Sequence, residues 1–138
     1  LLAMAFIMPL TFSVWNALLN NFVVETAGFD GSDIGMLHSL REIPGFMAFT
    51  AIFVLILLRE QTFALLSLLV MSLAVAATGC FPSVVGLYAT TVIMSIGFHY
   101  FETINQSLTL QFLPHGDTAH FMGRALAIKS MASLLAYG

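Results

Sequence analysis

The sequence predicts an all-α protein, a polytopic bundle of transmembrane helices, and two features of its composition and patterning support this. Hydrophobic residues make up 59% of the 138 residues and charged residues only 8%, whereas a soluble domain is about a quarter charged. The mean hydropathy is +0.98. The apolar residues also gather in runs of about 20, the length that crosses a bilayer. We therefore expect lipid rather than water to be the main solvent around this chain.

Five apolar runs qualify as membrane-spanning helices. They cover residues 2–24, 34–57, 62–80, 84–111 and 122–138. The segments between them are rich in turn residues, such as ETAGFDGSD before the second run and LPHGDTAH before the fifth. Ser32 or Asp33 is expected to cap the second helix, because a short polar side chain can accept a hydrogen bond from a free N–H there. Pro44 is expected to kink this helix without ending it.

The ends of the sequence predict that the chain is a fragment of a longer protein. Leu1 is not an initiator methionine, and Gly138 falls inside the fifth apolar run. The first run lacks the basic start of a signal peptide. We therefore expect the first run to be a membrane span rather than a signal peptide.

The few basic residues predict the orientation. Arg59 lies in the second loop and Arg124 begins the fifth helix just after the fourth loop, and both are counted as basic residues of these loops, whereas the first and third loops contain no Lys or Arg. Because basic loops stay inside, the N-terminal end is predicted to be cytoplasmic, in a multi-pass protein of a bacterial-type inner membrane. A net charge of −3 with four Lys and Arg disfavours nucleic acid as a partner, since phosphates need clustered cations.

Polar side chains inside the predicted spans are the candidate site residues. They are Asn16, Asn20, Arg41, Glu42, His99, Glu102, Asn105 and Gln106. A charged side chain at mid-bilayer costs about 2.5–3.5 kcal/mol on insertion scales, so these groups are expected to face protein or water. Ser95, His99, Thr103 and Gln106 recur at spacings of four and three and so share one helix face, with Glu102 beside them. We expect the first, second and fourth helices to surround a polar cavity, with the third against lipid.

Structural explanations stay open for these residues. Asn16 and Asn20 are also typical of interhelical hydrogen bonds. Arg41 and Glu42 are neighbours in sequence and are not expected to pair with each other, so either could form a bridge to another helix. His99 and Glu102 have an i, i+3 spacing that di-iron bundles use, but in the reverse order and with too few carboxylates.

No catalytic site, metal or cofactor is predicted. The single cysteine, Cys80, cannot form a zinc cluster by itself. No nucleophile–base pair is recognisable in the sequence, which disfavours an intramembrane enzyme.

Two stretches resemble a known family. The sequence GSDIGMLHSLREIPGFMA, residues 31–48, looks like the start of helix two of the major facilitator superfamily, with Gly35 near the outer end. The sequence MGRALAIKSMASLLAYG, residues 122–138, is similar to the family's entry into helix five, with Arg124 at the basic position. With the inward polar faces, the chain resembles five helices of the six-helix N-terminal half. The family's basic signature between helices two and three is reduced here to Arg59, which indicates a divergent branch.

The resemblance implies inverted three-helix repeats around a midplane site, with the C-terminal half of the same protein as the other wall. It predicts a secondary active transporter, a symporter or antiporter, that moves a small polar solute by alternating access with proton coupling. Glu102 or Glu42 would bind the proton, with Arg41 and His99 as its neighbours. Hydrogen bonds to the solute would come from Asn16, Asn20, Asn105 and Gln106. The alternative is a non-transporting sensor or assembly subunit with structural polar residues.

Overall fold

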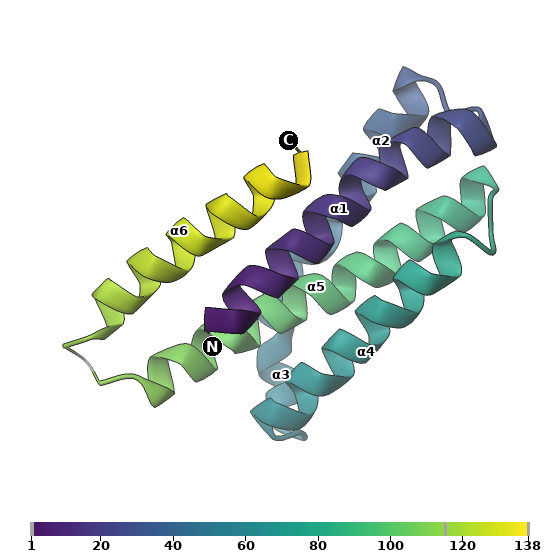
Figure 1. Cartoon of the computed structure of the whole chain (residues 1–138). Helices are drawn as coiled ribbons and strands as arrows, with labels where there is room; N and C mark the ends of the chain where they lie inside the picture. Colours follow the sequence, from purple (N-terminus) through teal and green to yellow (C-terminus); the bar gives the residue numbers. More distant parts are fainter. Residues whose placement is uncertain (1, 115, 138) are drawn as a thin grey trace. The chain divides into compact units, whose positions relative to one another are not determined.

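The computed structural model describes residues 2–114 and 116–137 and consists of helices joined by short loops, with no strand among these residues. The elements are α1 (Leu2–Ala27), α2 (Gly31–Phe46), the 3-10 turn η1 (Ala48–Thr50), α3 (Ala51–Leu55), α4 (Glu60–Thr78), α5 (Val84–Phe112) and α6 (Thr118–Tyr137) (Figure 1). The predicted all-α class is confirmed. The segment α2–η1–α3 occupies the second predicted run, and the other four runs each form one helix.

The chain divides into two units. The first unit contains Leu1–Phe22 and Thr109–Gly138, and the second contains Val23–Leu108. In the first unit, the Ser13 hydroxyl on α1 donates to Ser133 Oγ on α6 at 3.2 Å. Asn16 Nδ2, one turn further along α1, donates to the phenol oxygen of Tyr137 at 3.2 Å. From the first bond to the second, the residue numbers increase on both helices, so α1 and α6 run parallel here.

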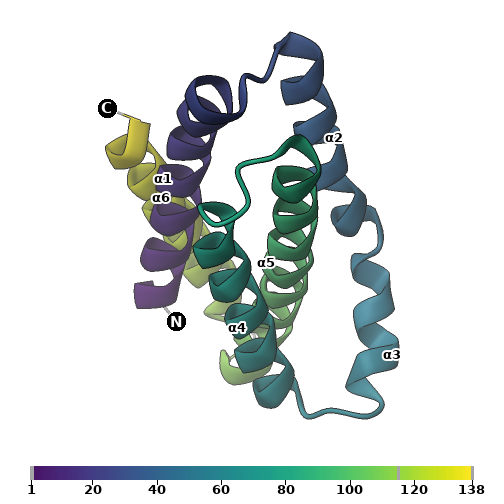
Figure 2. The same cartoon turned by 90° about the vertical axis from the view of Figure 1, so that its right-hand side faces the viewer.

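In the second unit, α5 packs against both α2 and α4 (Figure 2). The Tyr88 hydroxyl donates to the backbone carbonyl of Asp33 at 3.3 Å, and Ser95 Oγ donates to the carbonyl of Arg41. From the first contact to the second, the residue numbers increase on both helices, so α2 and α5 are parallel. The rings of Phe63 and Tyr100 meet at a centroid distance of 5.4 Å, and Gly97 lies against Ser67. A later residue of α4 thus meets an earlier residue of α5, so these two helices are antiparallel.

A glycine brings the backbones of α4 and α5 together. A Cβ on Gly97 would lie 2.6 Å from the carbonyl oxygen of Ser67 and 2.7 Å from the backbone nitrogen of Met71. Small residues at such crossings are typical of membrane helices, because close contact replaces the hydrophobic effect as the source of association. The buried face of α4 follows a helical period and consists of Phe63, Ala64, Ser67, Met71, Ala74 and Thr78. Its opposite face exposes leucines, as expected for a helix that also meets lipid.

The N-cap of α2 is Asp30, so the prediction of Ser32 or Asp33 is wrong. Asp30 Oδ1 accepts from the backbone N–H of Asp33 at 2.9 Å, and Asp33 Oδ2 accepts from the N–H of Asp30 at 3.3 Å. This reciprocal capping box satisfies two N–H groups at once. It lets α2 begin at Gly31, directly after the loop in which Gly28 takes a positive φ of 66°.

The second predicted span is interrupted, in contrast to the continuous helix expected over 34–57. Pro44 has no N–H to donate to the carbonyl four residues earlier, and α2 ends at Phe46. The N–H of Met47 turns back to the carbonyls of Ile43 at 3.3 Å and Pro44 at 3.2 Å. The hydroxyl of Thr50 then donates to the carbonyl of Met47 at 2.7 Å, which closes η1.

The other boundaries differ less. The helix α6 begins at Thr118 rather than at residue 122, and α4 and α5 lie within two residues of their predicted limits. The last residue of the predicted fifth span, Gly138, lies outside the described residues.

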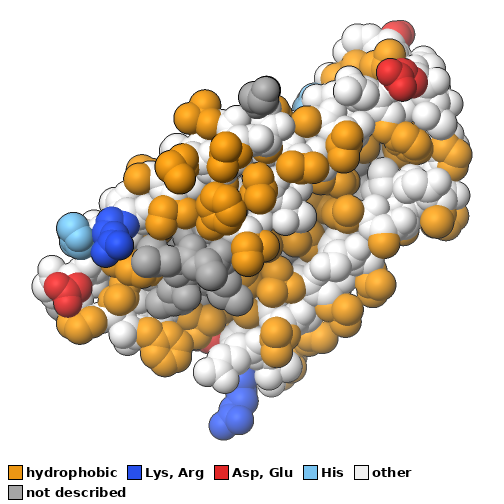
Figure 3. Space-filling model, in the orientation of Figure 1, with side chains coloured by type: hydrophobic (Ala, Val, Ile, Leu, Met, Phe, Trp, Pro, Cys, Tyr) orange, Lys and Arg blue, Asp and Glu red, His pale blue; other side chains and the backbone are white. Residues whose placement is uncertain are grey.

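Three helices are long and apolar enough to cross a membrane. Within the described part of the chain these are Phe6–Ala27, Glu60–Thr78 and Val84–Phe112. Hydrophobic side chains cover much of the face in Figure 3, and charged groups are few there. By contrast, α2 has only 16 residues before its break, about 24 Å of helix.

Candidate functional site

The eight predicted site residues fall in both units. Asn16 and Asn20 lie on α1 in the first unit, and Arg41 and Glu42 lie on α2 in the second. The four remaining residues lie in the second half of α5, also in the second unit. They are His99, Glu102, Asn105 and Gln106.

Arg41 and Glu42 form an ion pair, so the prediction that they do not pair is wrong. Nε and a terminal nitrogen of the Arg41 guanidinium donate to Glu42 Oε1 at 3.1 and 3.0 Å. Neighbouring side chains leave a helix about 100° apart, but these two are long enough to curve toward each other. The Arg41 side chain is 19% exposed and that of Glu42 is 56% exposed, so the pair lies at the edge of the helix packing.

The polar face of α5 begins as a direct contact with α2 rather than as a cavity wall. Ser95 is 1% exposed and donates to the Arg41 carbonyl. One turn later, the imidazole of His99 lies where a Cβ on Gly45 would meet Cε1 at 3.1 Å. The absence of a side chain at Gly45 therefore makes room for His99, which is half-buried.

The same face continues beyond His99. Glu102 and Asn105 are half-buried and Gln106 is exposed. The Thr103 hydroxyl donates back to the carbonyl of His99 at 2.9 Å, so it is satisfied within its own helix. Glu102, Asn105 and Gln106 stay candidates for contact with a solute.

A hydrogen bond that sequence reasoning missed fixes η1 to α5. The oxygens of Thr50 and Tyr100 are 2.6 Å apart. Since the Thr50 hydroxyl already donates its proton to the Met47 carbonyl, Tyr100 is the donor of this bond. The signal in the sequence was the phenol of Tyr100, directly after His99 in the fourth predicted span. The bond holds the interrupted part of the second span against α5.

The first unit contains a polar contact of its own. Asn16 donates to Tyr137 and Ser13 to Ser133, as described above. Asn16 therefore makes the interhelical hydrogen bond that was one of its two interpretations. Asn20 is half-buried, and among the described residues its buried Oδ1 has no hydrogen-bond partner.

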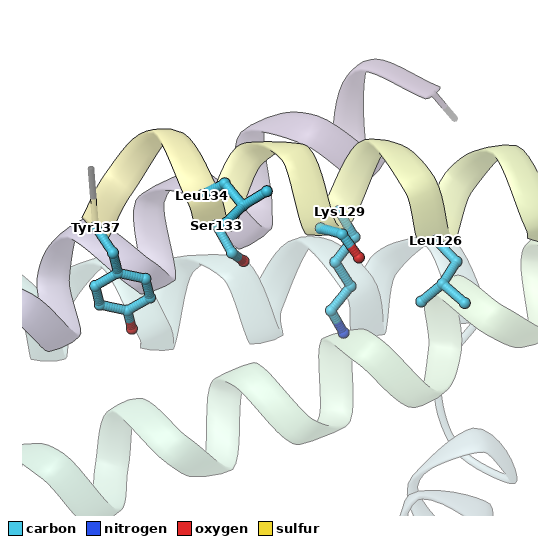
Figure 4. Close-up of a pocket in the computed structure, with 6 residues that line it drawn as sticks. Leu126, Lys129, Ser133, Leu134 and Tyr137 are labelled. Carbon is cyan, nitrogen blue, oxygen red and sulfur yellow. The ribbon is translucent and has the colours of Figure 1, made fainter.

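Beside this contact lies a hollow on α6, which we call the α6 hollow. This space is open rather than enclosed, is lined by α6 alone, and has a volume of about 460 Å³. The side chains of Lys129, Ser133 and Tyr137 point to one side of α6 (Figure 4). The full lining is Leu126, Lys129, Ser130, Ser133, Leu134 and Tyr137. The prediction missed this set, although the spacing of four between Lys129, Ser133 and Tyr137 places them on one helix face.

The two basic residues used for orientation lie in different settings. Arg59 is exposed in the loop before α4, as predicted. Arg124 is also exposed and lies in the fifth helix, as expected, six positions after its first residue, Thr118. The helix begins earlier than expected because the segment from Thr118 joins it.

Within the described residues, no group of three or more His, Cys, Asp or Glu side chains could hold a metal ion. Comparisons with protein families, curated proteins and solved structures found no match to this chain.

Proposed function

We propose that this chain belongs to a secondary active transporter that moves a small polar solute by alternating access, coupled to protons. The observation that carries the proposal is the character of α5. This helix has 29 residues and is apolar enough to span a membrane, yet its second half carries His99, Glu102, Asn105 and Gln106. Polar groups at such depth are costly and mark solute or proton pathways more often than not.

The directions of the helices support a multi-pass arrangement. If all five segments cross in turn, the first and fifth run the same way, as do the second and fourth. The hydrogen bonds make α1 parallel to α6 and α2 parallel to α5, and α4 antiparallel to α5. We therefore propose five spans with a cytoplasmic N-terminal end, in an inner membrane, completed by a C-terminal half of the same protein.

In this proposal Glu102 is the better candidate for the coupling proton. Glu42 accepts two hydrogen bonds from Arg41, which gives it a structural role within α2. Glu102 lies one turn beyond His99, on the part of α5 that follows the contact with Gly45. Asn105 and Gln106, one turn further, offer amide groups to the solute.

Specific observations favour the alternative, a non-transporting membrane protein, for some of these residues. Ser13, Asn16 and Ser95 all form hydrogen bonds between helices, and Arg41 is paired within α2. The coding sequence on both sides of this segment separates the two functions. A transporter requires a sixth helix, a basic connection and a second six-helix half, whereas a sensor would continue into a soluble output domain.

The mechanism is tested in proteoliposomes that contain the full-length protein. A panel of solutes is screened for uptake driven by a pH gradient and for exchange without one. Glu102→Gln is expected to abolish gradient-driven uptake and to preserve exchange, because the amide keeps the shape but cannot carry the proton. The matched control is Glu42→Gln. Gradient-driven uptake that is unchanged in Glu102→Gln would remove Glu102 from the coupling role.

A further inference from the structure

The second predicted span ends in a short piece that is separate from α2. This piece, which we call the 48–57 segment, contains η1 and α3. Just before it, Met47 has φ −87° and ψ 1°, which is a turn conformation rather than a helical one. At its end, the N–H of Leu57 turns back to the carbonyl of Val54 at 3.0 Å. A bend therefore bounds the segment on each side, and a few residues at the ends of an element are enough to absorb a hinge motion.

The 48–57 segment is weakly packed. Within this segment, which the structure describes completely, Ala51 is the one buried side chain. The large exposed apolar side chains of the segment are Phe49, Ile52, Phe53, Ile56 and Leu57. Parts of a protein with few buried contacts open at a lower free energy than the core does. We therefore expect this segment to move while the packed helices around it stay in place.

The segment follows the polar face of α5. Ser95 contacts Arg41, 54 positions earlier, and the contact of His99 with Gly45 has the same offset. Because α2 and α5 are parallel, this offset places the start of the 48–57 segment beside residues 102–108 of α5. Spacings of three and four continue the helix face of His99 toward the segment. The candidate residues on that continuation are Glu102 and Gln106.

One side-chain hydrogen bond joins the segment to α5. The hydroxyl oxygens of Thr50 and Tyr100 are 2.6 Å apart, and both side chains are half-buried. The Thr50 hydroxyl also donates to the carbonyl of Met47, which closes η1. A movement of the segment away from α5 breaks the bond to Tyr100 and leaves the bond within η1 intact.

We propose that the 48–57 segment is a gate of the transporter. It swings about the break at residues 44–47 and thereby covers or uncovers Glu102 and Gln106. The hydrogen bond between Tyr100 and Thr50 holds the gate closed. The proposal rests on the proposed function, because it assigns to this segment one of the movements of alternating access, but the movement itself is measured without transport.

The gate opens toward the inner side in the proposed orientation. The segment is followed directly by the loop that contains the exposed Arg59, and basic loops stay inside. Outward movement of the segment therefore exposes the polar face of α5 to the cytoplasm.

The first test measures distances between two spin labels in the full-length protein in liposomes. Phe53 on the gate and Leu69 on α4 are replaced by labelled cysteines in a background without other cysteines, since both side chains are exposed. We expect two distances, of which the longer one is the open gate. The control pair is Met36 with Leu69. Met36 is exposed on α2 before the break, so this pair is expected to give a single distance.

Matched variants test the hydrogen bond that closes the gate. Tyr100→Phe is expected to raise the ratio of long to short distances about threefold, the factor that corresponds to one average interhelical hydrogen bond. Tyr88→Phe removes the same hydroxyl from another contact between α5 and α2, ahead of the break, and is expected to leave the ratio unchanged. If Tyr100→Phe does not fold, Thr50→Val removes the other partner and is expected to have the same effect.

The second test asks whether the gate covers the polar face. Glu102→Cys is treated with a water-soluble thiol reagent in inside-out vesicles. Adding Tyr100→Phe is expected to raise the reaction rate about threefold, in step with the population of the open gate, and adding Tyr88→Phe is expected to leave it unchanged.

The proposal is overturned by a single, unchanged distance for the gate pair, by equal effects of Tyr100→Phe and Tyr88→Phe, or by a thiol reaction rate that does not follow the open population. These failures differ from failure of the transporter proposal. A gate that moves in a protein without solute movement would keep the gate and remove transport. Coupled transport with a rigid 48–57 segment would do the reverse.

Discussion

The imidazole of His99 on α5 lies directly against Gly45 of α2. A Cβ on Gly45 would meet the His99 ring at 3.1 Å from Cε1 and 3.2 Å from Nε2. The contact lies one residue after Pro44 and just before α2 ends at Phe46, so it fixes the point at which the second span is interrupted. His99 therefore has a packing role whatever solute or proton role it also has.

A larger side chain at position 45 is expected to destabilise the protein through His99. Gly45→Val should cost about 1–3 kcal/mol, the usual range for overpacking. In a His99→Ala background the same change should cost clearly less, because the ring is gone. Thermal unfolding of the four proteins in detergent measures this coupling, and an equal loss in both backgrounds would contradict the contact.

Gly97→Ala is expected to be much more damaging than its size suggests. The added methyl group would meet backbone atoms of Ser67 and Met71 at 2.6–2.7 Å, and backbone cannot rotate away as a side chain can. We expect α4 and α5 to separate, with a loss of about 3 kcal/mol or more and reduced yield of folded protein. Gly123→Ala is the matched control, because nothing lies within 4 Å of a Cβ there. That change should stabilise α6 by about 0.5–1 kcal/mol through helix propensity.

Tyr100→Phe is expected to weaken the attachment of η1 to α5. The change removes the donor of the 2.6 Å bond to Thr50 but keeps the ring that packs on Phe63. Interhelical hydrogen bonds in membrane proteins average about 0.6 kcal/mol, and we expect a coupling of that size. A double-mutant cycle with Thr50→Val measures it. Zero coupling would show that the two hydroxyls do not interact.

Cys80 offers a direct test of the proposed orientation. It is exposed in the loop between α4 and α5, which is expected on the outer side because it follows the third span. In intact cells, a membrane-impermeable maleimide is expected to label the unmodified protein and not the Cys80→Ser variant. Adding Arg59→Cys to that variant should give a protein that is labelled only after permeabilisation. The opposite labelling pattern would invert the proposed topology.

The sequence identified many residues of the candidate site by their type and spacing. It did not show which residues they contact. The helical face of Ser95 and His99 was correctly identified from spacing. That this face meets the backbone of Arg41 and the bare Gly45, rather than a cavity, could not be read from spacing. The ion pair of Arg41 with Glu42 was missed because helix geometry alone separates neighbours, and only the actual conformers of two long side chains bring them together.

The polar face of α6 was missed for a different reason. Lys129, Ser133 and Tyr137 all lie within the fifth span expected over 122–138, but the sequence prediction did not group them. Their spacing of four places them on one face of α6.

The sequence by itself determined the all-α class and the approximate position of each helical segment, because run length, hydropathy and turn residues are local properties of the chain. Only the tertiary structure decided which polar groups meet. Ser13 and Ser133 are 120 positions apart, and Ser95 and Arg41 are 54 apart. Such pairs depend on how each helix rotates and slides against its neighbour. In the second unit, the lack of a side chain at Gly97 and Gly45 allows the neighbouring helices to pack closely at these positions. The hydropathy pattern of the sequence does not contain this information.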